Sequence, residues 1–178
     1  TMAGFAIREA VKRAGVEPAE IDDVIMGNAL TQGTTGANIG RLSALAGGLP
    51  VTVSGMTIDR QCSSGMMAIA TAAKQIITDG MSIAIGGGLE SISMVQNEHM
   101  NTYQMVDKKL LAMHKDAYMP MLQTAEVVAK RYGISRDRQD EYGFQSQMRT
   151  AAAQAAGKFE DEIISVTTVK GVMDKETK

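Results

Sequence analysis

Helical and strand patterns alternate along the first 88 residues of the chain, and this alternation restricts the fold more than any other sequence feature. Strands are predicted where short apolar, β-branched runs lie between turn residues, and helices where apolar residues recur every three or four positions. The predicted strands cover residues 24–26, 51–58 and 81–85, and the predicted helices cover residues 3–14, 39–45 and 66–77. This order favours an α/β fold with a parallel or mixed sheet and helices on both faces.

The only cysteine, Cys62, lies between the strand predicted at 51–58 and the helix predicted at 66–77. Active sites of α/β proteins gather at the carboxyl ends of strands, and the first turn of a helix favours an anion such as a thiolate. Cys62 is therefore a candidate nucleophile. Two other roles fit the same position: a buried apolar filler, because free cysteines are often buried, or a passive anion site at the helix start.

The composition excludes several classes of protein. With 44% hydrophobic and 21% charged residues and a net charge of -2, the chain resembles an ordinary globular protein and offers no basic surface for nucleic acid. No apolar run approaches the roughly 20 residues that span a bilayer. A single cysteine forms no internal disulfide and no multi-cysteine zinc site. We therefore expect a soluble protein of a reducing compartment that holds no metal.

The triple glycine at residues 86–88 lacks the spacing of a nucleotide-binding loop. We attribute it to close backbone packing beside the strand, which glycine permits because it has no side chain. The regular alternation ends soon after this run. We expect a core of residues 1–91 and an inserted region of residues 92–178.

The inserted region begins with residues 91–120, which show no clean period and indicate a loop. A helix is predicted at 124–132, where Gly133 stops it, and a second helix follows Ser135 as far as Gly157. A last apolar run at 163–169 predicts a strand.

Four segments carry more information together than the cysteine does alone. They are RQCSSG at 60–65, GGGLESIS at 86–93, TAE at 124–126 and SRDRQD at 135–140. With these segments the chain resembles the thiolase family of acetyl-CoA acetyltransferases and 3-ketoacyl-CoA thiolases over nearly its whole length. The resemblance implies a layered thiolase fold, in which a mixed sheet carries helices on both faces. This chain would be an N-terminal fragment that holds the first core half, without its opening strand, and part of the inserted loop domain.

The resemblance also implies roles for individual residues near the nucleophile. Cys62 would take an acyl group from a coenzyme A thioester, and its backbone N–H would help to stabilise the oxyanion. Met121 would line the acyl-CoA pocket. Asn38 and Arg41 would have structural roles, holding the loop beneath the nucleophile. The coenzyme A thioester would be a substrate, and no covalently bound cofactor is implied.

A subunit interface is implied as well. The strand predicted up to residue 58 matches the one that pairs across the dimer axis of the family. Val53, Met56 and Ile58 would lie at this interface in a homodimer or homotetramer.

The chain departs from the family pattern in three respects. Asp59 stands where the family usually has asparagine, and a carboxylate there opposes thiolate formation. The histidine and the second cysteine of the family's chemistry are absent, and His99 and His114 match neither catalytic motif. We expect these two histidines at the surface or at an interface. The isolated chain is therefore expected to be inactive and poorly soluble.

The resemblance implies an acyltransferase of fatty acid metabolism that forms or cleaves 3-ketoacyl-CoA through an acyl-cysteine. Two alternatives are a thiolase-like protein that binds acyl-CoA or lipid without turnover, and a ketosynthase-like condensing enzyme. The expected compartment is the cytoplasm, or the mitochondrial matrix or peroxisome of a eukaryote.

Overall fold

The computed structural model describes residues 1–171, which form two compact units. The first unit contains Thr1–Asn101 and the segment that begins at Ile164, and the second contains Thr102–Ile163. The first unit therefore extends to residue 101 rather than 91. The reason is that the short helix after residue 91 packs into this unit through Val95, which is buried.

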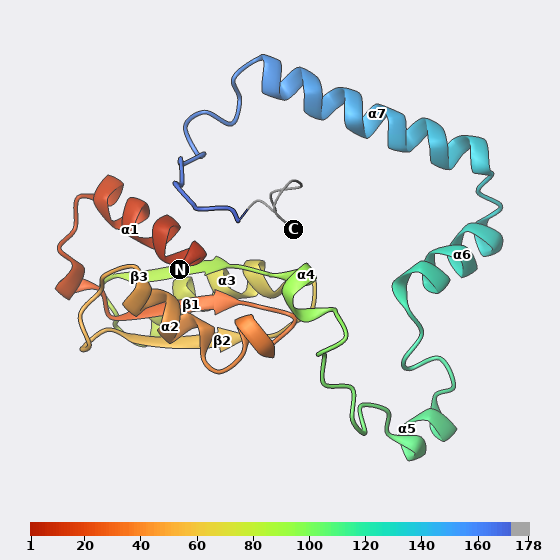
Figure 1. Cartoon of the computed structure of the whole chain (residues 1–178), viewed down its shortest axis with the longest axis horizontal. Coiled ribbons are helices and arrows are strands. Elements are labelled where there is room, and N and C mark those ends of the chain that lie inside the picture. Colours follow the sequence, from red (N-terminus) through yellow and green to blue (C-terminus); the bar gives the residue numbers. More distant parts are fainter. Residues whose placement is uncertain (172–178) are drawn as a thin grey trace, which may run out of the picture. The chain divides into compact units, whose positions relative to one another are not determined.

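The elements of the two units follow one another as Figure 1 shows. In the first unit they are α1 (Met2–Ala14), η1 (Pro18–Glu20), β1 (Asp23–Gly27), η2 (Gly33–Thr35), α2 (Ile39–Ala46), β2 (Ser54–Ile58), α3 (Ser64–Thr78), β3 (Ala84–Gly88) and α4 (Ile92–Val95). In the second unit they are α5 (Lys108–Met113), α6 (Met121–Tyr132) and α7 (Arg136–Ala155).

The three strands of the first unit form one parallel sheet in the order β2-β1-β3, with β1 in the middle (Figure 1). The α/β class is confirmed. The sheet is not mixed within the described residues, because α2 connects β1 to β2 and α3 connects β2 to β3. Crossovers of this kind return the chain to the same end of the sheet and make neighbouring strands parallel.

The central strand β1 is buried on both faces, which explains its unbroken apolar run. Val24 and Met26 pack into a cluster with residues of α1 and α2, including Ile7. Ile25, between them in the sequence, packs with Ala68 and other residues of α3. Successive strand residues point to opposite faces, so the two clusters place helices on both faces of the sheet, as predicted.

Two strands are displaced from their predicted bounds. Residues 51–53 form a turn in which the Val53 N–H donates to the Pro50 carbonyl (3.1 Å), so β2 begins at Ser54. Strand β3 begins at Ala84 and includes the three glycines, since residues 82 and 83 donate their N–H groups to the Asp22 carboxylate instead. Hydrogen bonds outside the ladder decide both starts, a local one at β2 and bonds to the distant Asp22 at β3.

Close packing explains the glycines of β3. A Cβ atom added to Gly86 would lie 2.8 Å from the Cα of Ile69 on α3, a distance that real Cβ atoms essentially never show. Helix α3 therefore contacts β3 at backbone distance. The attribution of this glycine run to close packing is confirmed at Gly86.

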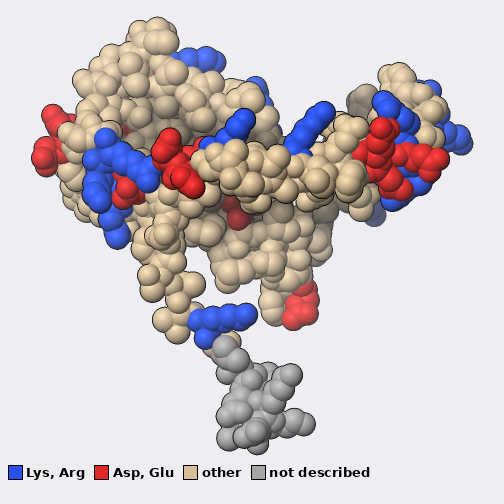
Figure 2. Space-filling model, turned by 90° about the horizontal axis from the view of Figure 1, so that it is seen from above, with Lys and Arg blue, Asp and Glu red and all other residues tan. Residues whose placement is uncertain are grey.

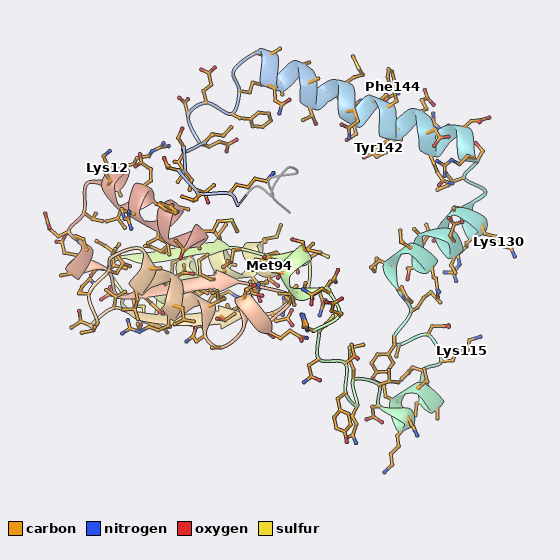
Figure 3. The ribbon with its side chains drawn as sticks, viewed as in Figure 1. Lys12, Met94, Lys115, Lys130, Tyr142 and Phe144 are labelled. Carbon is orange, nitrogen blue, oxygen red and sulfur yellow. The ribbon has the colours of Figure 1, made fainter. Side chains whose placement is uncertain are left out.

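Helices α6 and α7 of the second unit lie near their predicted positions, whereas α5 lies within residues 91–120, which were predicted as a loop. Helix α6 ends at Gly133, whose φ of 62° is left-handed, and α7 begins after Ser135, whose side chain accepts a hydrogen bond from the Arg138 N–H. On α7, Tyr142 and Phe144 extend from opposite sides (Figure 3), as expected for residues two positions apart. None of the described residues of α5, α6 or α7 is buried.

The prediction of a strand at 163–169 is wrong, because residues 163–171 form neither helix nor strand. Apolar runs become strands only beside an edge that takes up their hydrogen bonds, and the described part of the chain pairs none with this segment.

Surface charges are mixed. Lysine, arginine, aspartate and glutamate side chains lie near one another on the face drawn in Figure 2, and on α7 Arg136 pairs with Asp140 at 2.7 Å. No helix within residues 1–171 combines the length and apolarity that crossing a bilayer requires.

The close contact at Gly86 predicts a loss of stability in the Gly86→Ala variant of the full-length protein. The added methyl group forces α3 away from β3, and such overpacking costs about 1–3 kcal/mol of unfolding free energy. Urea unfolding followed by circular dichroism measures the loss. Gly143→Ala on α7 is the matched control, since no atom lies within 4 Å of its added Cβ and alanine favours a helix. Equal stability of the two variants would contradict the close packing.

Candidate active site

A cavity of about 510 Å³ lies where β1 and β3 end and α3 begins, and Cys62 lines it. The cavity residues come from the ends of the two strands, the turn before α3 and the start of α4. They are Gly27, Asn28, Ala29, Leu30, Gln61, Cys62, Ser64, Gly65, Gly88, Leu89, Glu90, Ile92 and Gln96. Cys62 is exposed, so its interpretation as a buried filler is wrong. The thiol is accessible to a ligand in the cavity.

The position of Cys62 relative to α3 differs slightly from the prediction. The helix begins at Ser64 with Ser63 as its N-cap, so Cys62 precedes the helix instead of lying in its first turn. A tight turn of residues 59–64 carries the cysteine. In this turn the Arg60 N–H donates to the Ser64 hydroxyl (2.8 Å), which in turn donates to the Gln61 carbonyl (2.6 Å).

The residue before the cysteine has an uncommon backbone conformation. Gln61 has a φ of 50°, in the left-handed region that residues with a side chain rarely occupy. The Asp59 carboxylate accepts a hydrogen bond from the Gln61 N–H at 2.8 Å and so stabilises this turn. Backbone strain of this kind persists only where surrounding contacts fix it, and such strain clusters at functional sites.

The Cys62 N–H differs from the N–H groups on either side of it. The Gln61 N–H is bound to Asp59, the Ser63 N–H to the Arg60 carbonyl (3.2 Å) and the Ser64 N–H to the Gln61 carbonyl (3.0 Å). The Cys62 N–H donates to none of the residues that the structure describes. It is therefore free to donate a hydrogen bond to a carbonyl oxygen that becomes negatively charged beside the thiol.

The start of α3 rests directly on the end of β1. A Cβ atom added to Gly27 would lie 2.2 Å from the carbonyl carbon of Ser64. This contact places the turn that carries Cys62 beside the residues that follow β1.

A polar pair forms another part of the cavity wall. Asn28 directly follows β1, and Glu90 comes two residues after β3. The Glu90 carboxylate accepts hydrogen bonds from the Asn28 amide (2.7 Å) and from the Ala29 N–H (2.8 Å). Sequence reasoning assigned no role to either residue. The sequence feature that could have identified them is a polar residue just after each of two strands that are neighbours in the parallel sheet.

Asn38 and Arg41 have a structural role, but they hold β2 and the turn before it against α2 and not, as expected, the loop beneath Cys62. The Asn38 amide donates to the Gly55 carbonyl (2.7 Å), and its oxygen accepts from the Thr57 hydroxyl (3.0 Å). The Arg41 guanidinium donates to the carbonyls of Val51 (2.9 Å) and Val53.

The predicted interface residues differ in exposure. Val53 is 1% exposed and belongs to the core of its own chain, so its side chain is closed to a partner, contrary to the prediction. Met56 and Ile58 are half-buried against the Ile25 cluster and keep part of their surface open.

Three other singled-out residues lie outside the cavity lining. Met121 is the first residue of α6 in the second unit and lines a separate groove of α6 and the start of α7. His99 and His114 are exposed, as expected for surface residues. The structure brings neither histidine into the wall around Cys62.

Sequence and structure comparisons agree on one family. The whole chain, residues 1–178, matches the family described as "Thiolase, N-terminal domain". A 3-ketoacyl-CoA thiolase of Bacillus subtilis is 40% identical over 93% of this chain and 42% of its own length. An acetyl-CoA acetyltransferase of Cupriavidus necator is 39% identical over 93% of this chain and 44% of its own length.

A solved structure gives the same result. The crystal structure of the Bacillus anthracis acetyl-CoA acetyltransferase matches with a TM-score of 0.76 and 37% identity, over 93% of this chain and 44% of that one. The chain thus spans less than half the length of these relatives. With its parallel sheet, the turn around Cys62 and these matches, the chain belongs to the thiolase family.

Proposed function

We propose that the full-length protein is an acyltransferase of the thiolase type, which forms or cleaves 3-ketoacyl-CoA through an acyl group on Cys62. The observation that carries this proposal is an exposed thiol in a cavity, on a residue whose own N–H is unbonded among the described residues. The names of the relatives support the same chemistry, since they include acetyl-CoA acetyltransferase and 3-ketoacyl-CoA thiolase.

The first half-reaction follows from these groups. The Cys62 sulfur attacks the carbonyl carbon of an acyl-CoA thioester, and negative charge develops on the carbonyl oxygen. The Cys62 N–H stabilises that charge by a hydrogen bond. The tetrahedral intermediate collapses, the bond to the coenzyme A sulfur breaks, and coenzyme A leaves as the thiolate, which takes up the proton that the cysteine gave up. A second acyl-CoA then receives the acyl group, and the family resemblance assigns its deprotonation to residues outside this chain.

We assign the remaining roles by the same resemblance. The coenzyme A thioester is a substrate and not a resident cofactor, and Met121 contributes to its acyl pocket. The protein works in the cytoplasm, or in the matrix or peroxisome of a eukaryotic cell, within fatty acid metabolism.

Incubation of the full-length protein with acetyl-CoA tests the proposal. Peptide mass spectrometry is expected to find one acetyl group on Cys62, and Cys62→Ala is expected to lower thiolase turnover at least about a thousandfold, because the nucleophile is gone. Ser146→Ala, an exposed change on α7, is the control and keeps full turnover. Turnover that survives in the Cys62→Ala variant would reject the proposed mechanism.

The charge of Asp59 gives a second prediction. Asp59→Asn keeps an oxygen that accepts from the Gln61 N–H, so the turn persists, but it removes a negative charge that opposes the thiolate. Alkylation of Cys62 by iodoacetamide at neutral pH should become roughly two- to tenfold faster, as expected when a partly screened charge three residues away is removed. Peptide mass spectrometry follows the rate at this cysteine. An unchanged or slower rate in a folded variant would show that the carboxylate does not act on the thiol.

We further propose that β2 pairs with β2 of a second subunit in a homodimer, which can assemble into a tetramer. Strand β2 is an edge of the described sheet, and exposed edges readily pair with another strand. Met56 and Ile58 lie on one face of this strand, two residues apart, and keep part of their surface open.

A charge in this strand is expected to weaken the dimer. Met56→Lys would place an ammonium group at the interface, and an unpaired charge there costs about 3–5 kcal/mol. Light scattering over a range of protein concentrations should show a larger monomer fraction. Met113→Lys, at an exposed methionine of α5, is the matched control. A folded Met56→Lys variant that stays as oligomeric as the control would count against pairing through β2.

A further inference from the structure

The segment that follows β1 forms one wall of the Cys62 cavity. Residues 28–30 have left the sheet, apart from the Asn28 N–H, which donates to the Ile58 carbonyl at 3.0 Å. The next two N–H groups need other acceptors, since buried or half-buried N–H groups are costly when unpaired. Both find the Glu90 carboxylate, Ala29 at 2.8 Å and Leu30 at 3.3 Å. We call residues 28–30 the β1 wall.

The Asn28 side chain reinforces this connection. It is 1% exposed, and its amide nitrogen donates to the Glu90 carboxylate (2.7 Å) and to the Leu89 carbonyl (2.9 Å). Its oxygen has no partner among the described residues. A buried acceptor without a partner is unfavourable, yet the opposite orientation would set that oxygen against two other oxygens. The bonds to Leu89 and Glu90 therefore fix the orientation of Asn28.

Glu90 is held by hydrogen-bond donors and not by a cation. Donors from Asn28, Ala29 and Leu30 converge on its carboxylate, and within residues 1–171 no ion pair involves Glu90. Hydrogen bonds to an ionised group are shorter and stronger than neutral ones. One carboxylate thus ties the segment after β1 to the segment after β3.

The β1 wall lies next to the turn that carries Cys62. Gly27, the residue before the wall, approaches Ser64 at backbone distance, and the Leu89 N–H donates to the Gly27 carbonyl at 3.1 Å. A shift of the wall would therefore change the cavity in which a thioester meets the thiol.

We propose that Glu90 is a positioning residue for acyl transfer, which acts by fixing the β1 wall of the cavity that Cys62 lines. The proposal rests on the proposed function, since it concerns the acyl transfer to Cys62. Glu90 does not itself need to contact the thioester. Its charge matters because both oxygens accept: an amide at this position would direct its NH₂ group at a donor in either orientation.

The test compares three variants of the full-length protein. Glu90→Gln keeps the shape of the side chain but loses one acceptor. Asn28→Leu removes the two amide donors and also the unpartnered oxygen, so its cost in stability is partly offset. Glu98→Gln, at an exposed carboxylate that lies 3.6 Å from the His99 imidazole, is the matched control. The rate of Cys62 acetylation is measured by rapid quench and mass spectrometry over a series of acetyl-CoA concentrations, together with the folded fraction from thermal unfolding.

The expected result is a loss in rate rather than in affinity. Acetylation per folded molecule at saturating acetyl-CoA should fall about 10- to 100-fold in Glu90→Gln, since misplacement by 1 Å can cost about a hundredfold. The acetylation rate of the Asn28→Leu variant should fall less, because the two backbone donors to Glu90 remain. The half-saturating concentration should change by less than about twofold in both variants, since the wall positions the thioester instead of supplying its affinity.

Each other outcome overturns the positioning role. A purely structural role would lower the folded fraction and leave the rate per folded molecule equal to that of Glu98→Gln. A rise in the half-saturating concentration at constant maximal rate would make Glu90 a binding residue instead. Failure of the wild-type protein to acetylate Cys62 would reject the proposed function itself, whereas wild-type acetylation with unaltered variants rejects the positioning role alone.

Discussion

The structure around Cys62 depends on the contact of helix α3 with the sheet at backbone distance. Gly27 at the end of β1 and Gly86 within β3 both face α3, and neither position has room for a Cβ atom. The helix therefore lies closer to the strands than side-chain packing allows. This contact places the first turn of α3 against the ends of the strands. Cys62, which precedes that turn, therefore lines the cavity at the strand ends. The constraint that positions Cys62 therefore lies in contacts of the backbone.

Parts of the fold followed directly from sequence because their signals are local. Helices α1 and α6 end at Gly15 and Gly133, both with left-handed φ, and Ser135 caps the start of α7. The run 24–26 predicted a strand, and β1 (Asp23–Gly27) contains it. In each case one or two neighbouring residues determine the outcome, so no distant contact needs to be known.

The errors at β3 and at residues 163–169 arose where distant partners decide. The start of β3 depends on Asp22, which lies some sixty positions away in the sequence and takes up the N–H groups of residues 82 and 83. The run at 163–169 looked like a strand by composition, but no strand pairs with it among the described residues. The same limit applies to the site. Cys62 was identified from its own surroundings, whereas the link between Asn28 and Glu90 spans 62 positions and is visible only once β1 and β3 are neighbours.

The turn before α3 explains why the nucleophile precedes the helix. A residue inside the first turn also has a free N–H, but its side chain must follow helical geometry. At residue 62 the turn uses the N–H groups of Gln61, Ser63 and Ser64 internally and leaves only the cysteine's own donor unused within this stretch. The thiol and the donor therefore belong to one residue, and their relative position depends only on its covalent geometry and on the χ1 rotamer of Cys62. The left-handed Gln61 is the conformational cost of this arrangement, and the hydrogen bond from its N–H to Asp59 offsets part of it. A substrate carbonyl that meets the sulfur thus meets the donor at the same time, so the precision of the site rests on the six hydrogen bonds that fix the turn of residues 59–64.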